Sequence, residues 1–268
     1  VSNCFISECL GVMEEIASVL GKNDEAEIFA NRKMKLNILL HETYFNAEKN
    51  IYATGSQLDM SYPMLVGVVP YHLYDKVKNE MIVRTAKEYN GHIAVGLVGV
   101  PILTEWVTKN KEVDFMYSML KQPDYPGYLH MLNNGATTTW EYWHGERSRV
   151  HNCYNGIGTW FYEAIGGIVP DKKYPGYKHF YIDPQIPNGV TWAKTTKESP
   201  FGTIVVDWEL KGSHQRIHIT IPIGAKATFI SPEKAISYQV DNSKFTDKGS
   251  KNILLESGVH IIDIELLD

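Results

Sequence analysis

The sequence predicts a mixed α+β chain in which a set of helical hairpins is followed by an antiparallel β-sandwich. Two observations predict this class. Apolar residues recur at three- and four-residue spacing up to about Gly167, and they alternate with polar residues after Pro170. The 268 residues are 44% hydrophobic, which is enough to bury a large core. We therefore expect a helical domain over residues 1–170 and a β-sandwich domain over residues 171–268.

The first two helices are predicted from apolar stripes that each occupy one face. The first stripe, which we expect to be buried, comprises Phe5, Cys9, Val12, Ile16 and Leu20. Gly21 interrupts this helix. The stripe of the second helix comprises Phe29, Leu36, Leu40 and Tyr44. Because the connection between the two helices is short, they should form an antiparallel hairpin.

Further helical stretches follow, separated by short connections that contain Gly, Pro or Asn. They are Ser56–Val66, Tyr71–Tyr89, Pro101–Lys109, Val113–Lys121 and Asn155–Gly166. The Gly-rich stretch GHIAVGLVGVP, residues 91–101, contains neither G-x-G-x-x-G nor G-K-[ST], so the sequence gives no phosphate loop there. We interpret it as a tight loop that enters a helix, with His92 as a candidate cavity residue that would contact substrate.

The C-terminal part alternates apolar and polar residues, as strands with one buried face do. In TIVVDWEL the apolar set is Ile204, Val206, Trp208 and Leu210. In RIHITIPI it is Ile217, Ile219, Ile221 and Ile223. In HIIDIELLD it is Ile262, Ile264 and Leu266. We expect Trp192 and Trp208, which fall on this pattern, to lie in the core of the sandwich.

Charge and composition exclude several classes of partner. The formal net charge is -5 without a long basic block, which argues against nucleic acid. The longest apolar run, Ile93 to Leu103, has about 11 residues against the ~20 that span a bilayer, so we expect no membrane segment. The chain has three scattered cysteines and no C-x-x-C, so we predict no metal site and no cofactor. The start at Val1 without Met suggests an interior fragment, which leaves the compartment unknown.

The stretch NNGATTTWEYWHGERSRVHN, residues 133–152, contains the main candidate site. Glu141 is flanked by Trp140, Tyr142 and Trp143, and aromatic neighbours can change the pKa of a carboxyl by desolvation and provide faces for sugar rings. His151 follows and is a candidate polar contact at the same site. The structural alternative is a Glu at a helix start among core aromatics. The consecutive threonines argue against a regular helix here.

Glu146 is a second carboxylate in the same stretch. A Glu141 and Glu146 pair could serve as acid and base of a glycosidase. We prefer a structural Glu146 that is paired with Arg147 or Arg149, its neighbours in the sequence. The single-carboxylate hypothesis, with Glu141 alone, is therefore the stronger one.

Three segments resemble the C-terminal half of bacterial α-L-rhamnosidases of glycoside hydrolase family 78. They are GATTTWEYWHG, HNCYNGIGTWFYEAIGGI and PGYKHFYIDPQIPNGVTWAKTTKESPFGTIVVDWEL. The resemblance implies the end of an (α/α)6 barrel followed by a β-sandwich. It implies hydrolysis of terminal α-L-rhamnose from a carbohydrate substrate with inversion, with Glu141 as general base and His151 as a sugar contact. Trp140, Tyr142 and Trp143 would shape the wall of the site.

The sequence departs from the family pattern at positions near His151 that affect substrate recognition, and it lacks one motif that catalysis requires. Val150 precedes His151 where the family has Asn, and the loop after Trp143 is short. The acidic R-D-E-R…W-x-G-D motif that carries the general acid is absent. We therefore expect the acid to lie upstream, the chain to need the remainder of its own barrel as partner, and the fragment to be inactive alone.

Two other functions remain open at the level of sequence. One is another (α/α)6 glycosidase, acting on a fucoside, a uronic acid or a polysaccharide. A uronic-acid site would need a basic anchor, for which Arg147, Arg149 and Arg84 are the candidates. The other is a non-catalytic carbohydrate-binding module. The sequence does not give the glycan, the aglycone or the oligomeric state.

Overall fold

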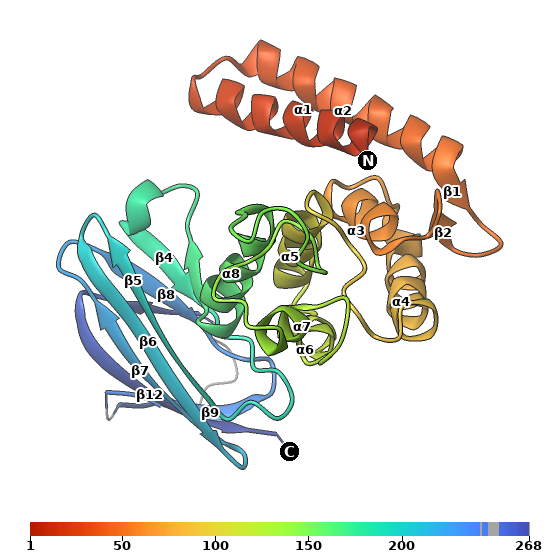
Figure 1. Cartoon of the computed structure of the whole chain (residues 1–268). Helices are drawn as coiled ribbons and strands as arrows, with labels where there is room; N and C mark the ends of the chain where they lie inside the picture. Colours follow the sequence, from red (N-terminus) through yellow and green to blue (C-terminus); the bar gives the residue numbers. More distant parts are fainter. Residues whose placement is uncertain (242, 246–251, 268) are drawn as a thin grey trace. The chain divides into compact units, whose positions relative to one another are not determined.

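The computed structural model describes residues 1–241, 243–245 and 252–267, which form two compact units, Val1–Ile157 and Gly158–Asp268 (Figure 1). The first unit is mainly helical, and the second consists mainly of two β-sheets. The predicted fold class, helical hairpins followed by a sheet-rich domain, is confirmed. The predicted domain limits at residues 170 and 171 stay a prediction.

The first unit contains the helices that the apolar spacing predicts. They are α1 (Ser2–Val19), α2 (Asn23–Tyr44), α3 (Gln57–Leu65), α4 (Tyr71–Glu88), α5 (Gly99–Lys109) and α6 (Val113–Leu120). Three short elements were not expected, namely the strands β1 (Phe45–Asn46) and β2 (Ile51–Tyr52) and the helix α7 (Tyr128–Asn133). Among the described residues, no helix is long and apolar enough to cross a membrane.

Helices α1 and α2 form the predicted antiparallel hairpin, but the predicted burial of the α1 stripe is wrong (Figure 1). Phe5 is 42% exposed, Val12 50% and Leu20 65%. The buried residues of α1 are instead Cys4, Ser7 and Ala17. Spacing shows that a helix has an apolar face, but it does not show which element covers that face. Within the described chain, α1 buries a narrower stripe of small residues.

The core of the helical unit lies between α3, α4, α5 and α6. Its largest fully buried side chains include Tyr62, Met81, Leu103, Trp106 and Met116. The Trp106 indole Nε1 donates to the Tyr74 hydroxyl at 3.0 Å, and this hydroxyl donates to Asn110 Oδ1 at 2.6 Å. The polar atoms of Trp106 and Tyr74 are thus satisfied within this core.

The stretch Asn155–Gly166, predicted as one helix, is three short turns. These are the 3-10 turn Cys153–Gly156, α8 (Ile157–Trp160) and a π-helical turn Phe161–Ile165. A Cβ atom on Gly156 would lie 3.1 Å from the Cα atom of Pro101, so the chain approaches α5 at a distance that glycine alone permits without displacement. The prediction of helical turns was correct for this stretch, but the turns do not share one continuous α-helical hydrogen-bond pattern.

The second unit contains a six-stranded and a four-stranded sheet. The strands are β3 (Ile168–Pro170), β4 (His179–Ile182), β5 (Trp192–Ser199), β6 (Gly202–Lys211), β7 (His214–Ile221), β8 (Lys226–Ile230), β9 (Ala235–Val240), β10 (Ser243–Phe245), β11 (Asn252–Leu255) and β12 (Gly258–Leu266). The larger sheet has the order β10-β9-β12-β7-β6-β5, and the smaller one β11-β8-β4-β3. The predicted antiparallel pairing holds except between β4 and β8, which run parallel.

The alternation on β6, β7 and β12 predicted the buried face of the larger sheet. The fully buried residues are Ile204, Val206, Trp208, Ile217, Ile219, Ile221, Ile262 and Ile264. Two expectations were wrong. Ile223 is 90% exposed because β7 ends at Ile221, before the alternating pattern does. Trp192 is 68% exposed at the start of the edge strand β5, whereas Trp208 is buried and donates its indole N–H to the carbonyl of Ile165 at 2.8 Å.

Candidate functional site

The candidate stretch folds as an irregular hairpin, and residues 139–151 are called the site hairpin below. The His151 amide donates to the Thr139 carbonyl at 2.9 Å, and the Glu141 amide donates to the Ser148 carbonyl at 2.8 Å. The Thr139 hydroxyl Oγ1 also lies 2.6 Å from the His151 carbonyl oxygen. These contacts hold residues 139–141 beside residues 148–151. The expectation that the consecutive threonines exclude a regular helix is therefore confirmed.

A tight turn closes the site hairpin over Trp140. The Gly145 amide donates to the Tyr142 carbonyl at 3.0 Å, and Gly145 has a φ of 80°. A Cβ atom at this position would lie 2.8 Å from the six-membered ring of Trp140, which is only 4% exposed. On another side, the Arg149 guanidinium lies 5.3 Å from the centroid of the Trp140 ring system. The indole is thus fixed between the turn and the arginine.

Glu141 is half-buried, and one of its carboxylate oxygens is held by the backbone. The Ser148 amide donates to Oε2 at 3.3 Å. The other oxygen, Oε1, accepts no hydrogen bond from the part of the chain that the structure describes. A carboxylate with one oriented oxygen and one open oxygen has the arrangement required to bind and deprotonate a water molecule.

The aromatic neighbours of Glu141 differ in what they contact. Trp143 is buried, donates its indole N–H to the Val95 carbonyl at 3.0 Å, and packs on Tyr154 at 4.0 Å between centroids. It therefore connects the site hairpin to the Gly-rich loop. Tyr142 is exposed and stacks on His144 at 5.4 Å. The predicted contact of either ring with a sugar stays a prediction.

His151 belongs to the site hairpin, whereas His92 is held elsewhere. The Cys153 amide donates to His151 Nδ1 at 3.3 Å, and Nε2 has no hydrogen-bond partner among the described residues. His92 is buried, with Nε2 at 2.7 Å from an oxygen of Asp124 and Nδ1 at 3.0 Å from the Tyr89 carbonyl oxygen. The His92 contact lowers the pKa of the Asp124 carboxyl. The protein therefore occupies both ring nitrogens of His92, and the contact of His92 with substrate stays a prediction.

Glu146 does not form the predicted ion pair. Neither Arg147 nor Arg149 lies within ion-pair distance of Glu146 or of another carboxylate in the described ranges. Arg147 has a positive φ of 59°, and its guanidinium lies over the Tyr142 ring, 5.6 Å from the ring centroid. Both arginines thus contact aromatic rings instead of carboxylates.

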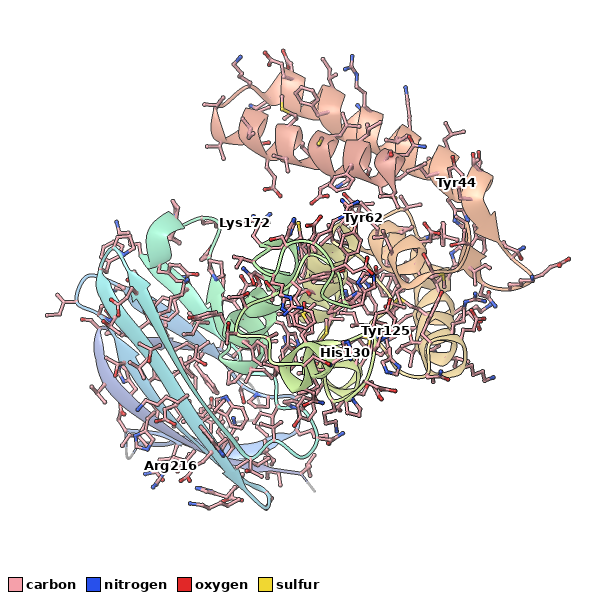
Figure 2. All side chains as sticks on the ribbon, in the orientation of Figure 1. Tyr44, Tyr62, Tyr125, His130, Lys172 and Arg216 are labelled. Atoms are coloured by element: carbon pink, nitrogen blue, oxygen red, sulfur yellow. The ribbon has the colours of Figure 1, made fainter. Side chains whose placement is uncertain are left out.

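An open depression of about 530 Å³ adjoins the site hairpin. Its lining residues are Tyr125, His130, Asn134, Trp140, His144 and Arg149. Tyr125 and His130, which Figure 2 labels, meet edge to face with ring centroids 5.6 Å apart. Of the lining residues, Trp140 was a predicted site residue and Arg149 was a candidate anchor for a uronic acid. Tyr125 and His130 precede the stretch, and Asn134 is its second residue. No periodic pattern of the sequence pointed to these three residues.

Two family models match the chain. The model of the bacterial alpha-L-rhamnosidase 6 hairpin glycosidase domain matches residues 1–165, and that of the bacterial alpha-L-rhamnosidase C-terminal domain matches residues 167–246. An alpha-L-rhamnosidase of Formosa agariphila is 27% identical over 267 residues, covering 95% of this chain and 28% of the relative. An alpha-L-rhamnosidase of Alteromonas sp. strain LOR is 25% identical over 257 residues, covering 91% and 28%.

A solved structure shows the same fold. The crystal structure of Streptomyces avermitilis alpha-L-rhamnosidase complexed with L-rhamnose matches 99% of this chain and 26% of that chain, with a TM-score of 0.87 and 20% identity. The chain spans 28% of the length of the two relatives described above. Because the model of the six-hairpin domain alone matches residues 1–165 of the 268, the chain belongs to the bacterial alpha-L-rhamnosidase family.

Proposed function

We propose that this chain is part of an inverting glycoside hydrolase that releases terminal α-L-rhamnose from glycans or glycosides, with Glu141 as general base. The observation that carries the proposal is the state of Glu141, whose Oε2 is fixed by the Ser148 amide while Oε1 is open. The relatives named alpha-L-rhamnosidase, which match nearly the whole chain, support the choice of sugar. The fold shared with a rhamnosidase that binds L-rhamnose supports it as well.

The proposed reaction is a single displacement. Glu141 takes a proton from a water molecule, and the water oxygen attacks the anomeric carbon as the bond to the aglycone oxygen breaks. A general acid on the opposite face protonates the departing oxygen. In such enzymes the two carboxyl groups are about 6.5–9.5 Å apart, which leaves room for the water. The open Nε2 of His151 is suited to a hydrogen bond with a sugar hydroxyl.

We further propose that the general acid comes from residues outside this chain. The chain lacks the acidic R-D-E-R…W-x-G-D motif of the family that it resembles. It spans 28% of the length of the two relatives described above. In this proposal, the 268 residues can orient water through Glu141 but cannot protonate the aglycone. The remainder of the barrel is thus the required partner, and the isolated chain does not turn over rhamnosides.

A Glu141→Gln substitution in the full-length protein tests the role of the base. The amide keeps the shape of the side chain but cannot accept the proton, so we expect kcat on an aryl α-L-rhamnoside to fall by roughly 10²–10⁴-fold. The matched control is Glu146→Gln, which alters a nearby exposed carboxylate. Proton NMR of the first product formed by the unsubstituted protein should show β-L-rhamnose. A near-normal kcat for Glu141→Gln would refute the assignment, and an α product would refute inversion.

A further inference from the structure

The depression beside Trp140 has a basic lining with no carboxylate. Arg149, His130 and His144 contribute its ionisable groups, and Tyr125, Trp140 and Asn134 complete it. Rhamnose is a neutral 6-deoxy sugar, so its recognition requires hydrogen bonds and aromatic contacts but no cation. The Arg149 guanidinium on this surface therefore suits a second, anionic group.

Arg149 has a guanidinium that the protein leaves available. It lies over the Trp140 ring system and forms no ion pair with a described carboxylate. Arg84 and Arg216 are different, because Glu88 lies 2.6 Å from the first and Asp263 2.7 Å from the second. An arginine stacked on an indole keeps its N–H groups at the edge of the plane, where they can bind a carboxylate or sulfate in bidentate geometry.

The other lining groups are fixed by neighbouring contacts. The His144 ring stacks with Tyr125 at 6.2 Å between centroids and with Tyr142 at 5.4 Å, both within 8° of parallel. The Asn134 side chain donates to the His130 carbonyl at 2.8 Å. A surface whose side chains are already ordered loses less conformational entropy when a ligand binds.

The depression also lies next to the proposed base. Glu141 and Ser148 are joined by two hydrogen bonds, and Trp140 and Arg149 are their immediate neighbours in the sequence. In our proposal, a glycan whose rhamnose is placed at Glu141 extends toward Arg149.

We propose that this depression is a subsite for an anionic group of the substrate glycan, with Arg149 as its main anchor. The group is the carboxylate of a uronic acid or a sulfate ester, which share the chemistry that a guanidinium recognises. This inference rests on the proposed function, because it concerns the substrate of the same site. It specifies rhamnose-containing acidic glycans as the preferred substrate class.

The test compares kcat/KM of the full-length protein on matched substrates. They are a disaccharide of α-L-rhamnose linked to glucuronic acid, the methyl ester of that disaccharide, and aryl α-L-rhamnosides with and without a sulfate ester. We expect a preference of roughly 10- to 100-fold for at least one anionic form over its neutral counterpart. Which pair shows the preference identifies the carboxylate or the sulfate as the natural group.

Arg149→Gln should reduce this preference to a few-fold or less, and Arg149→Lys should retain an intermediate preference. The matched control is Arg147→Gln, which removes an arginine that is also unpaired but does not line the depression. The control should preserve the preference. Raising the salt concentration should weaken the preference of the unsubstituted protein, as expected for a solvent-exposed charge contact.

Equal kcat/KM on both members of each pair would overturn the subsite while leaving the proposed function intact. An anion preference unchanged by Arg149→Gln would also overturn it. If no α-L-rhamnoside is hydrolysed at all, the proposed function fails and the subsite with it. Should Arg149→Gln fold poorly, as judged by its thermal unfolding, the Arg149→Lys ratio and the salt dependence decide the question.

Discussion

At the scale of single residues, Gly145 determines the position of Trp140 beneath the turn. Its φ of 80° lies in the left-handed region, and the Trp140 ring occupies the space where a side chain would begin. Two independent requirements, backbone conformation and close approach, thus coincide at one glycine. The ring beneath it is the wall of the depression and the stacking surface for Arg149.

Gly145→Ala should therefore destabilise the site hairpin. Strain at a positive φ and the contact with Trp140 should together lower the free energy of unfolding by about 1–3 kcal/mol. Chemical denaturation followed by tryptophan fluorescence measures this change. Gly212→Ala is the matched control, since Gly212 also has a positive φ, 62°, but no atom near its Cβ position. An equal loss of unfolding free energy in Gly145→Ala and Gly212→Ala would contradict the role given to the Trp140 contact.

At the scale of elements, Asp171 and His179 connect the end of β3 to the strands β4 and β8 of the smaller sheet. Asp171, directly after β3, accepts the Lys173 amide at 2.9 Å and lies 2.7 Å from Nδ1 of His179 on β4. The other ring nitrogen of His179 lies 2.9 Å from the hydroxyl of Thr228 on β8. The parallel β4–β8 pair is thus supported by side chains as well as by the backbone.

This cluster should make the stability of the β unit depend on pH in the acid range. The Lys173 amide, the His179 ring and the Tyr181 side chain lower the pKa of Asp171 below its ordinary value. A carboxyl with a lowered folded-state pKa stabilises the fold above its unfolded-state pKa, and that stabilisation is lost as pH falls through the folded-state pKa. The thermal midpoint should therefore fall more steeply below about pH 4 in the unsubstituted chain than in Asp171→Asn.

Melting curves from pH 7 to pH 3 measure this difference. Asp207→Asn serves as control, because Asp207 is more exposed and lies 3.6 Å from Lys194 on the neighbouring strand. Parallel pH profiles for the unsubstituted chain and Asp171→Asn would contradict the linkage.

At the scale of the whole molecule, the helical unit carries a large apolar surface on α1 and α2. The exposed apolar residues of the pair are Phe5, Ile6, Val12, Met13, Ile16, Val19, Leu20, Ile28, Met34, Ile38, Leu39 and Tyr44. Soluble monomers rarely expose contiguous apolar patches of more than a few hundred Å². The proposed remainder of the barrel is a partner of matching chemistry for this surface.

We therefore expect the 268-residue chain, produced alone, to self-associate through α1 and α2. Sedimentation velocity should show species larger than a monomer, and the pair of changes Val12→Glu and Ile16→Lys should shift the chain toward the monomer. Val259→Glu, which alters an apolar residue that is 69% exposed on β12, is the control. A monodisperse, cooperatively melting monomer of the unsubstituted chain would contradict this expectation.

Periodicity predicted most of the elements, because helical and strand spacings are local properties of the sequence. It did not predict that the stripe from Phe5 to Leu20 is exposed, since burial depends on which other element is present. It also missed His130 and Tyr125, which join Trp140 only through folding of a segment without a period. Glu141 and His151 were predicted from their unusual neighbours in the sequence and from the family resemblance. The structure has both on the site hairpin, and their roles stay predictions.

The hydrogen bonds between Glu141 and Ser148 allow two properties of the site to vary separately. These are the position of the proposed base and the surface beside it. Both hydrogen bonds between Glu141 and Ser148 use backbone groups of Ser148, so these contacts do not require a particular side chain at the exposed positions 144 and 146. These intervening residues, His144 among them, face the part of the glycan beyond the rhamnose in our proposal. With Trp143 and Gly145 retained, the exposed positions can therefore change in sequence while the geometry of the base persists, which provides a route to new substrates without loss of the reaction.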